Sequence, residues 1–113
     1  MITSTSETLC NYICGEWLEP SAAETIPVLN PATGETLGSV PLSSAADVDY
    51  AVRAAAQAFP AWRRVPVTER VQYLFRLKNA LEANFEDIAV TITRECGKTL
   101  AEARAEFRRA IEN

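Results

Sequence analysis

The sequence contains no histidine, which narrows the chemistry available to its 113 residues. Without an imidazole, these residues cannot form a Ser/His/Asp or Cys/His catalytic pair, or a metal site with histidine ligands. The three cysteines, Cys10, Cys14 and Cys96, do not have the paired spacing of a zinc site. An odd number of thiols is typical of free cysteines in a reducing compartment, so we expect a cytoplasmic protein.

Positive charge and long apolar runs are also scarce. Residues 1–30 contain no lysine or arginine, and the whole chain has a net charge of −4. That charge argues against a nucleic-acid-binding role. No apolar run approaches the ~18 residues of a membrane-spanning helix. Residues 1–8 are rich in serine and threonine but lack the basic residues of a secretory signal or a transit peptide. We therefore expect them to form a loose tail.

The pattern that follows predicts β-hairpins over about residues 9–41, with no helix. Aromatic and β-branched residues flank Gly15, where a turn is expected. A second turn lies at residues 30–35, where Pro31 fixes φ and Gly34 supplies a positive φ. The expected strands are Leu9–Ile13, Glu16–Leu18, Thr25–Leu29 and Thr36–Pro41.

From residue 44 onward, apolar residues recur at helical spacing, so the predicted fold is α/β, with hairpins followed by four helices. Ser44 is the expected N-cap of the first helix, with Asp47 at its third position. Thr99 and Glu102 have the spacing of a capping box. The expected helices span about residues 45–60, 66–83, 85–96 and 100–113.

Three residues are expected to mark helix ends. Pro60 should end the first helix, Asn84 should cap the third, and Gly97 should stop it. The apolar stripe expected on the last helix consists of Leu100, Ala103, Phe107 and Ile111.

The segment around Gly97 also invites two chemical interpretations. Gly97-Lys98-Thr99 resembles the end of a phosphate-binding loop, but that loop needs a further glycine where Ile92 stands. We therefore interpret the segment as a turn between helices. Cys96 lies at a helix C-terminus on an apolar stripe, without a histidine to activate it, so we expect a packed thiol rather than a nucleophile.

Arg109 has two open interpretations. Glu106 stands three residues earlier, which favours a local ion pair. Alternatively, the planar guanidinium of Arg109 could bind a substrate carboxylate through two hydrogen bonds. Glu95 could similarly ligate a cation, although a surface carboxylate is the simpler interpretation.

Taken together, these motifs resemble the amino-terminal part of the aldehyde dehydrogenase superfamily, over nearly all of residues 9–113. Within it, they are most similar to the CoA-acylating branch, the methylmalonate-semialdehyde dehydrogenases, especially through residues 109–113. The matching residues are Tyr12-Ile13-x-Gly15-Glu16-Trp17, Asn30-Pro31-Ala32-Thr33-Gly34-Glu35, Asp47-Val48-Asp49-x-Ala51, Ala58-Phe59-x-Ala61-Trp62, Glu69-Arg70, Glu95-x-Gly97-Lys98-Thr99 and Glu102-Ala103.

The resemblance implies an oxidoreductase that oxidises a small semialdehyde with NAD and passes the acyl group from a catalytic cysteine to CoA. The substrate would lose its carboxylate as CO2, so that methylmalonate semialdehyde gives propionyl-CoA and malonate semialdehyde gives acetyl-CoA. It implies that Arg109 binds the carboxylate of the substrate. It also implies a monovalent cation near Val28, Leu29 and Glu95, and full-length members that assemble as homo-oligomers, with a tetramer expected.

The last helix has no glycine or proline stop before Asn113. This suggests a chain that was meant to continue. The resemblance implies that residues 9–113 are part of an amino-terminal NAD-binding domain whose catalytic cysteine and cofactor sites lie further along, and that the chain alone is inactive. Two alternatives stay open. One is another NAD(P)-dependent aldehyde dehydrogenase, for which Arg109 is the discriminator, since a neutral aldehyde does not require it. The other is a non-catalytic helical interaction module that is complete at Asn113.

Overall fold

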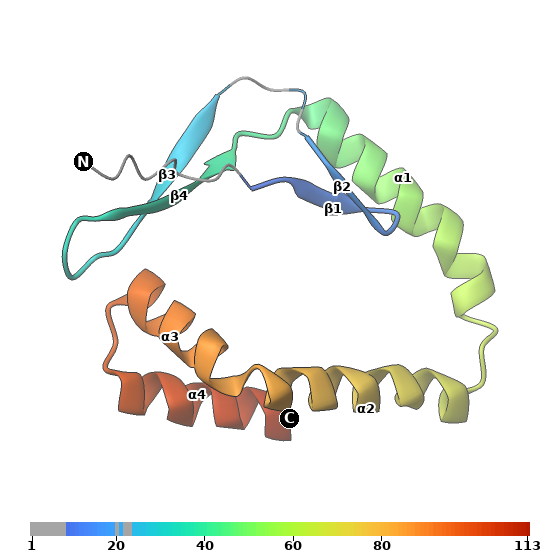
Figure 1. Cartoon of the computed structure of the whole chain (residues 1–113). Coiled ribbons are helices and arrows are strands. Elements are labelled where there is room, and N and C mark those ends of the chain that lie inside the picture. The colour runs from blue at the N-terminus through green and yellow to red at the C-terminus, as the bar shows by residue number, and fades with distance from the viewer. Residues whose placement is uncertain (1–8, 20, 22–23) are drawn as a thin grey trace. The chain divides into compact units, whose positions relative to one another are not determined.

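A computed structural model describes residues 9–19, 21 and 24–113 of the chain. The tail expected at residues 1–8 lies outside the described residues. The chain divides into two compact units: a first unit of Met1–Leu29 and Thr36–Arg64, and a second unit of Asn30–Glu35 and Val65–Asn113. Figure 1 gives the order of the elements along the chain.

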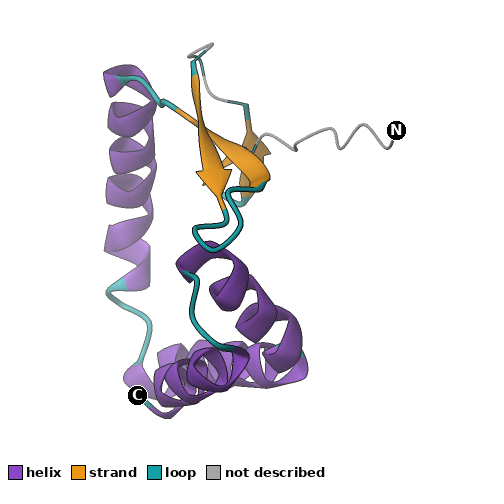
Figure 2. Cartoon of the chain, turned by 90° about the vertical axis from the view of Figure 1, so that its left-hand side faces the viewer, coloured by secondary structure: helices purple, strands orange, loops and turns teal. Residues whose placement is uncertain are grey.

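The first unit contains two antiparallel hairpins and one helix (Figures 1 and 2). Tyr12 pairs with Trp17 in the first hairpin, and their rings lie 4.9 Å apart. Ile26 pairs with Val40 in the second hairpin, whose register shifts between Val28 and Leu29. The elements are β1 (Asn11–Ile13), β2 (Glu16–Leu18), β3 (Thr25–Leu29), β4 (Thr36–Pro41) and α1 (Ala45–Trp62).

The predicted hairpins are confirmed, with one difference at their start. β1 begins at Asn11 rather than Leu9 because the amide of Leu9 donates to the carbonyl of Ser39 at 2.9 Å, which lies in β4 and not in the partner strand β2. Strand pairing needs a continuous ladder with one partner. Leu9 therefore does not belong to the β1–β2 ladder, which begins at Asn11.

The prediction that Pro60 ends α1 is wrong, since the helix continues to Trp62. Proline removes one backbone donor, but its carbonyl and those around it still accept. The amide of Arg63 donates to the carbonyl of Phe59 at 2.9 Å, and that of Arg64 to Ala61 at 3.1 Å. Because Pro60 lies so close to the end of α1, one missing bond does not stop the last turn.

The second unit contains three helices and the turn of residues 30–35. α3 and α4 pack side by side (Figure 1) around a small core of Ala89, Ala103 and Phe107, which are 0%, 0% and 7% exposed. The stripe predicted for α4 is thereby confirmed, with Leu100 and Ile111 half-buried at its ends. The helices are α2 (Val67–Ala83), α3 (Phe85–Cys96) and α4 (Leu100–Glu112).

The junctions between these helices follow the sequence in two cases and depart from it in one. Gly97 adopts a left-handed φ of 69° and ends α3, as predicted, and Pro66 precedes α2. Asn84 does not cap α3 with its side chain. Its Nδ2 instead donates to the carbonyl of Ala80 at 2.8 Å, because the last turn of α2 also leaves carbonyls without partners.

Much apolar surface is left uncovered in the described chain. No residue of α1 is buried, although the sequence places Val48, Val52 and Phe59 on one helix face. No helix of the described residues has the length and apolar content to cross a membrane.

Candidate functional site

The side chains of α4 that could bind an anion are three arginines, and the structure treats each differently. Arg104 forms hydrogen bonds to the carboxylate of Glu86, the second residue of α3. Its Nε donates to Oε1 and Oε2 at 3.2 and 3.0 Å, and its Nη2 donates to Oε2 at 2.7 Å. These bonds raise the pKa of Arg104. The fork of Arg104 is therefore already occupied by a carboxylate of the chain itself.

Arg108 is also held, by an aromatic ring and a carboxylate. Its guanidinium lies 4.4 Å from the centre of the Phe85 ring, and its Nη1 lies 3.8 Å from Oε1 of Glu82. Phe85 in turn stacks on Phe107 at 5.2 Å, with the rings tilted by 40°. The same Glu82 accepts a hydrogen bond from Lys78 at 2.7 Å, and this bond lowers the pKa of its carboxyl.

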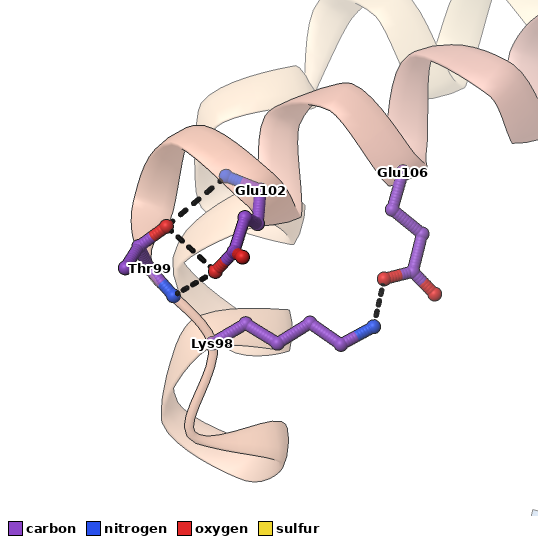
Figure 3. A network of polar contacts seen from close by, with 4 residues as sticks. All are labelled: Lys98, Thr99, Glu102 and Glu106. Carbon is purple, nitrogen blue, oxygen red and sulfur yellow. Dashed lines mark hydrogen bonds and ion pairs between the residues drawn. The ribbon is translucent and has the colours of Figure 1, made fainter.

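The side chain of Arg109 is exposed, and its guanidinium makes no hydrogen bond or ion pair with another described residue. The ion pair predicted between Arg109 and Glu106 is not formed, because Glu106 pairs with Lys98 instead (Figure 3). The hydrogen bond from Lys98 is the main cause that lowers the pKa of Glu106, and the charge of Arg109 adds only a smaller effect. The guanidinium of Arg109 is therefore the one on α4 left open, within the described residues, to an outside ligand.

Helical geometry sets the side from which such a ligand would approach. With about 100° per residue, Arg109 stands roughly 200° around the helix from the buried Phe107. It therefore faces away from the core of the second unit. A carboxylate bound by Arg109 would lie on the outer surface of α4, beside the small side chain of Ala105 one turn earlier.

The start of α4 is fixed by a capping box, as the sequence predicted (Figure 3). The amide of Glu102 donates to Oγ1 of Thr99 at 3.3 Å, and the amide of Thr99 donates to Oε2 of Glu102 at 3.0 Å. The hydroxyl and amide of Thr99 together lower the pKa of the Glu102 carboxyl. Figure 3 also shows Lys98 reaching along the helix toward Glu106, so the Gly97-Lys98-Thr99 segment is a helix-to-helix turn, as interpreted.

The predicted cation ligands fall into both units. Val28 and Leu29 lie in β3, where the shift in register interrupts regular pairing, and Glu95 lies exposed in the last turn of α3. A bulge of this kind leaves a residue outside the ladder. The described residues contain no group of three or more histidine, cysteine or acidic side chains that would hold a metal. Whether these three positions share a cation stays a prediction.

The cysteines are free thiols, but one lies differently than expected. Cys96 is exposed, so the prediction of a packed thiol is wrong. It lies on the same face of α3 as the buried Ala89, but at the last position of the helix, one residue before the chain turns at Gly97. The chain contains no histidine that could activate this thiol.

Two features of the second unit escaped the sequence reading. The Glu86–Arg104 pair joins residues 18 positions apart, a separation that no local spacing rule signals. An apolar groove of about 310 Å³ also lies between α2 and the end of α4. The helical spacing of its α2 residues was the available signal. Its lining consists of Val71, Leu74, Phe75, Leu77, Lys78, Leu81, Ala110, Ile111 and Asn113.

Comparison with known proteins places this arrangement in context. A sequence model described as the aldehyde dehydrogenase family matches residues 17–113. Malonate-semialdehyde dehydrogenase 2 of Shouchella clausii is 46% identical over 112 residues, which cover 99% of this chain and 23% of that protein. Malonate-semialdehyde dehydrogenase 2 of Geobacillus kaustophilus is 45% identical over 111 residues, again covering 98% of this chain and 23% of the relative. The chain thus spans about a quarter of the length of these curated relatives.

Solved structures agree with the sequence relatives. Lactaldehyde dehydrogenase from Escherichia coli superposes with a TM-score of 0.91 at 27% identity, over 95% of this chain and 22% of its own. A protein from Sinorhizobium meliloti, described as a candidate methylmalonate-semialdehyde dehydrogenase and solved with NAD, gives 0.89 at 31% identity. That match covers 96% of this chain and 22% of the other. The hairpins and four helices are therefore the amino-terminal elements of a fold that other proteins share.

Proposed function

The chain belongs to the aldehyde dehydrogenase family, and from that premise we propose that it serves in a dehydrogenase for malonate or methylmalonate semialdehyde. The contribution of this chain is the segment that carries Arg109, which binds the carboxylate of the substrate. The proposal is supported by relatives named malonate-semialdehyde dehydrogenase, which match 98–100% of the chain at 43–46% identity.

One observation carries the proposal: the Arg109 side chain is exposed and pairs with none of the described residues, while Arg104 and Arg108 are held by Glu86 and Phe85. A guanidinium matches a carboxylate in geometry and charge, and bonds between charged groups are about twice as strong as neutral ones. A semialdehyde of this class carries a carboxylate that a neutral aldehyde lacks. An unpaired arginine would therefore distinguish the two substrates.

The reacting groups belong, in this proposal, to the roughly three quarters of the relatives' length that the chain does not span. There, a cysteine thiolate would attack the aldehyde. Loss of a hydride to NAD and of the carboxylate as CO2 would leave an acyl group on the cysteine, which would then pass to CoA. The NAD that accompanies the Sinorhizobium meliloti protein supports this part of the proposal. Binding of the substrate carboxylate is the step assigned to this chain.

Three further expectations belong to the same proposal. A monovalent cation would be held by the carbonyls of Val28 and Leu29 and the carboxylate of Glu95, supported by the register shift at the first two. The dehydrogenase would be a homotetramer. A cytoplasmic location is supported by the three free thiols, which are typical of a reducing compartment.

The test is a chimera in which this chain replaces the matching segment of the Shouchella clausii relative. We expect the chimera to form NADH from malonate semialdehyde in the presence of CoA. Replacing Arg109 with alanine should raise KM for malonate semialdehyde by about 10- to 100-fold, since a lost bond to a charged group costs about 1.5–3 kcal/mol. KM for propanal, which has no carboxylate, should stay within about twofold.

The matched control is Arg53→Ala, which removes an exposed arginine of α1 that pairs with Asp49 at 2.8 Å. It should leave both substrates unaffected. If Arg109→Ala weakens propanal and malonate semialdehyde equally, the carboxylate role is excluded, and another aldehyde dehydrogenase activity is favoured.

A further inference from the structure

We propose that Phe85 and Glu86 are positioning residues that set the direction in which Arg109 faces, and so determine selectivity for carboxylated aldehydes. The inference rests on the proposed role of Arg109. Neither residue is expected to touch the substrate. They act by holding α4 through Arg104 and Arg108, the two arginines that precede Arg109 on the same helix.

The contacts are concentrated in one place. Phe85 and Glu86 are the first two residues of α3, and between them they hold two arginines one helical turn apart. Phe85 lies between two residues of α4, with the guanidinium of Arg108 at 4.4 Å and the ring of Phe107 at 5.2 Å. Phe85 and Glu86 therefore make three contacts with α4. Two are with the arginines on one flank of α4, and the third is with Phe107 on its buried face.

This arrangement restricts the rotation of α4 about its own axis. Arg104 and Arg108 lie on one flank of the helix, and Lys98 holds Glu106 on the other. The surface of a helix lies about 5–6 Å from its axis, so a rotation of roughly 10° displaces a surface group by about 1 Å. A displacement of about 1 Å at a binding group can reduce activity on the order of 100-fold. The Arg109 guanidinium has no hydrogen bond or ion pair to another of the described side chains that would correct such a displacement.

The energetics separate this role from a contribution to stability. The side chains of Arg104 and Glu86 are 47% and 60% exposed. Exposed ion pairs contribute little to folding because solvent screens them. The core of Ala89, Ala103 and Phe107 does not depend on either. The Glu86–Arg104 pair can therefore be broken without unfolding the chain, so an effect on Arg109 can be measured separately from stability.

The experiment uses the same chimera with Glu86→Gln, which removes the charge but keeps the size of the side chain. A second variant, Phe85→Leu, keeps an apolar contact for Phe107 but removes the ring beneath Arg108. We expect each to raise KM for malonate semialdehyde by about three- to tenfold, with kcat and both propanal constants within about twofold. The exchanged pair Glu86→Arg with Arg104→Glu should restore KM.

The control is Asp49→Asn, which removes an exposed ion pair from α1 and should change nothing. An unchanged KM in both variants, with Arg109→Ala still selective, overturns the inference and leaves the proposed function standing. A parallel loss with both aldehydes, together with a lower Tm, also overturns it, because that is the signature of a structural role. If Arg109→Ala itself shows no selectivity, both proposals fail together.

Discussion

Each of the two units of the chain is stabilised internally by a different kind of interaction. In the second unit, α3 and α4 enclose all three of the buried apolar residues found in the described chain, Ala89, Ala103 and Phe107. In the first unit, no residue of α1 is buried, and polar contacts join its parts. Asn11 donates to Ser43 at 2.8 Å, and Ser21 donates to Asp47 at 2.8 Å.

The difference shows that one local device can serve two environments. Both α1 and α4 begin with a capping box, Ser44 with Asp47 and Thr99 with Glu102. In the second unit, the capping box of α4 adds its hydrogen bonds to the stability that the apolar core provides. At the start of α1, the carboxylate of Asp47 also accepts a hydrogen bond from Ser21. This bond replaces apolar packing as the link between the loop after β2 and the helix. We expect the stability of the second unit to depend on the volume of its buried side chains, and the stability of the first to depend on hydrogen bonds.

The largest effect should come from Phe107→Ala, which would break this comparison at its strongest point. Phe107 is 7% exposed, and truncating a buried phenylalanine costs about 3–5 kcal/mol. Unfolding of the chain in urea, followed by circular dichroism, measures the loss. Phe59→Ala is the matched control in α1, where the ring is 57% exposed and the cost should be below about 1 kcal/mol. Equal losses would mean that the two units do not differ as described.

Gly97→Ala should have the next largest effect, because it combines two costs. Its φ of +69° is left-handed, which costs a residue with a side chain about 1–2 kcal/mol. A Cβ there would also lie 3.0 Å from Cγ of Pro31, in the turn that belongs to the second unit. Gly34→Ala is the control, since its φ is +75° and nothing lies within 4 Å of an added Cβ. The same unfolding experiment gives the difference, which reports the Pro31 contact alone; a larger loss at Gly34 would contradict this account.

These two glycines show which parts of the fold are readable from sequence. Gly97 and Gly34 signal positive φ by themselves, and Ser44 and Thr99 signal helix starts by spacing, so local rules were sufficient for them. Pro60 and Asn84 were misjudged because each can meet two demands. A proline near a helix end removes only one bond, and an asparagine between two helices can serve the carbonyls of the first rather than the amides of the second.

The candidate site was readable only in part, for a related reason. Arg109 could be named from the family motif, but its freedom depends on where its neighbours' partners lie. Glu106 pairs with Lys98, and Arg104 pairs with Glu86, which lies 18 residues earlier in the chain. Such pairings are set by the packing of α3 on α4, which no spacing within one helix reveals. The exposure of Cys96 likewise reflects where a helix ends rather than which face it shares.

The capping boxes should also differ in their response to pH. Hydrogen bonds from Ser44 and then Ser21 lower the pKa of Asp47, and those from Thr99 lower the pKa of Glu102. A carboxyl whose pKa is lowered in the folded state stabilises the fold above its ordinary value and loses this effect as pH falls through the lowered value. Because the ordinary pKa of glutamate is higher than that of aspartate, the loss should begin at a higher pH for Glu102 than for Asp47.

Amide protection factors between pH 6 and pH 2 would measure this at the first turns of α1 and α4. Asp47→Asn should remove the dependence at α1 alone, and Glu102→Gln should remove it at α4 alone. Because Asp47 also holds Ser21, its loss should expose amides of the first unit beyond the helix. An unchanged pH profile at α1 in Asp47→Asn would show that the cap is not the group that titrates.

The smallest effect is expected from Cys14→Asn, which tests whether the first unit gains from better turn chemistry rather than from packing. Cys14 is the one residue other than glycine with a positive φ among the described residues, at 57°, and Gly15 follows at 84°. Two successive positive φ values define the tight hairpin turn that strongly favours Asn-Gly. Asparagine tolerates this conformation better than cysteine, so the hairpin should gain a few tenths of a kcal/mol, on the scale of about 1 kcal/mol for such backbone effects. Cys96→Asn, an exposed cysteine in a helix, should give no gain in the same unfolding experiment, because asparagine is a poor helix former. A gain at both positions would point to removal of a thiol, and only a gain confined to Cys14 would show that backbone conformation limits the stability of the first unit.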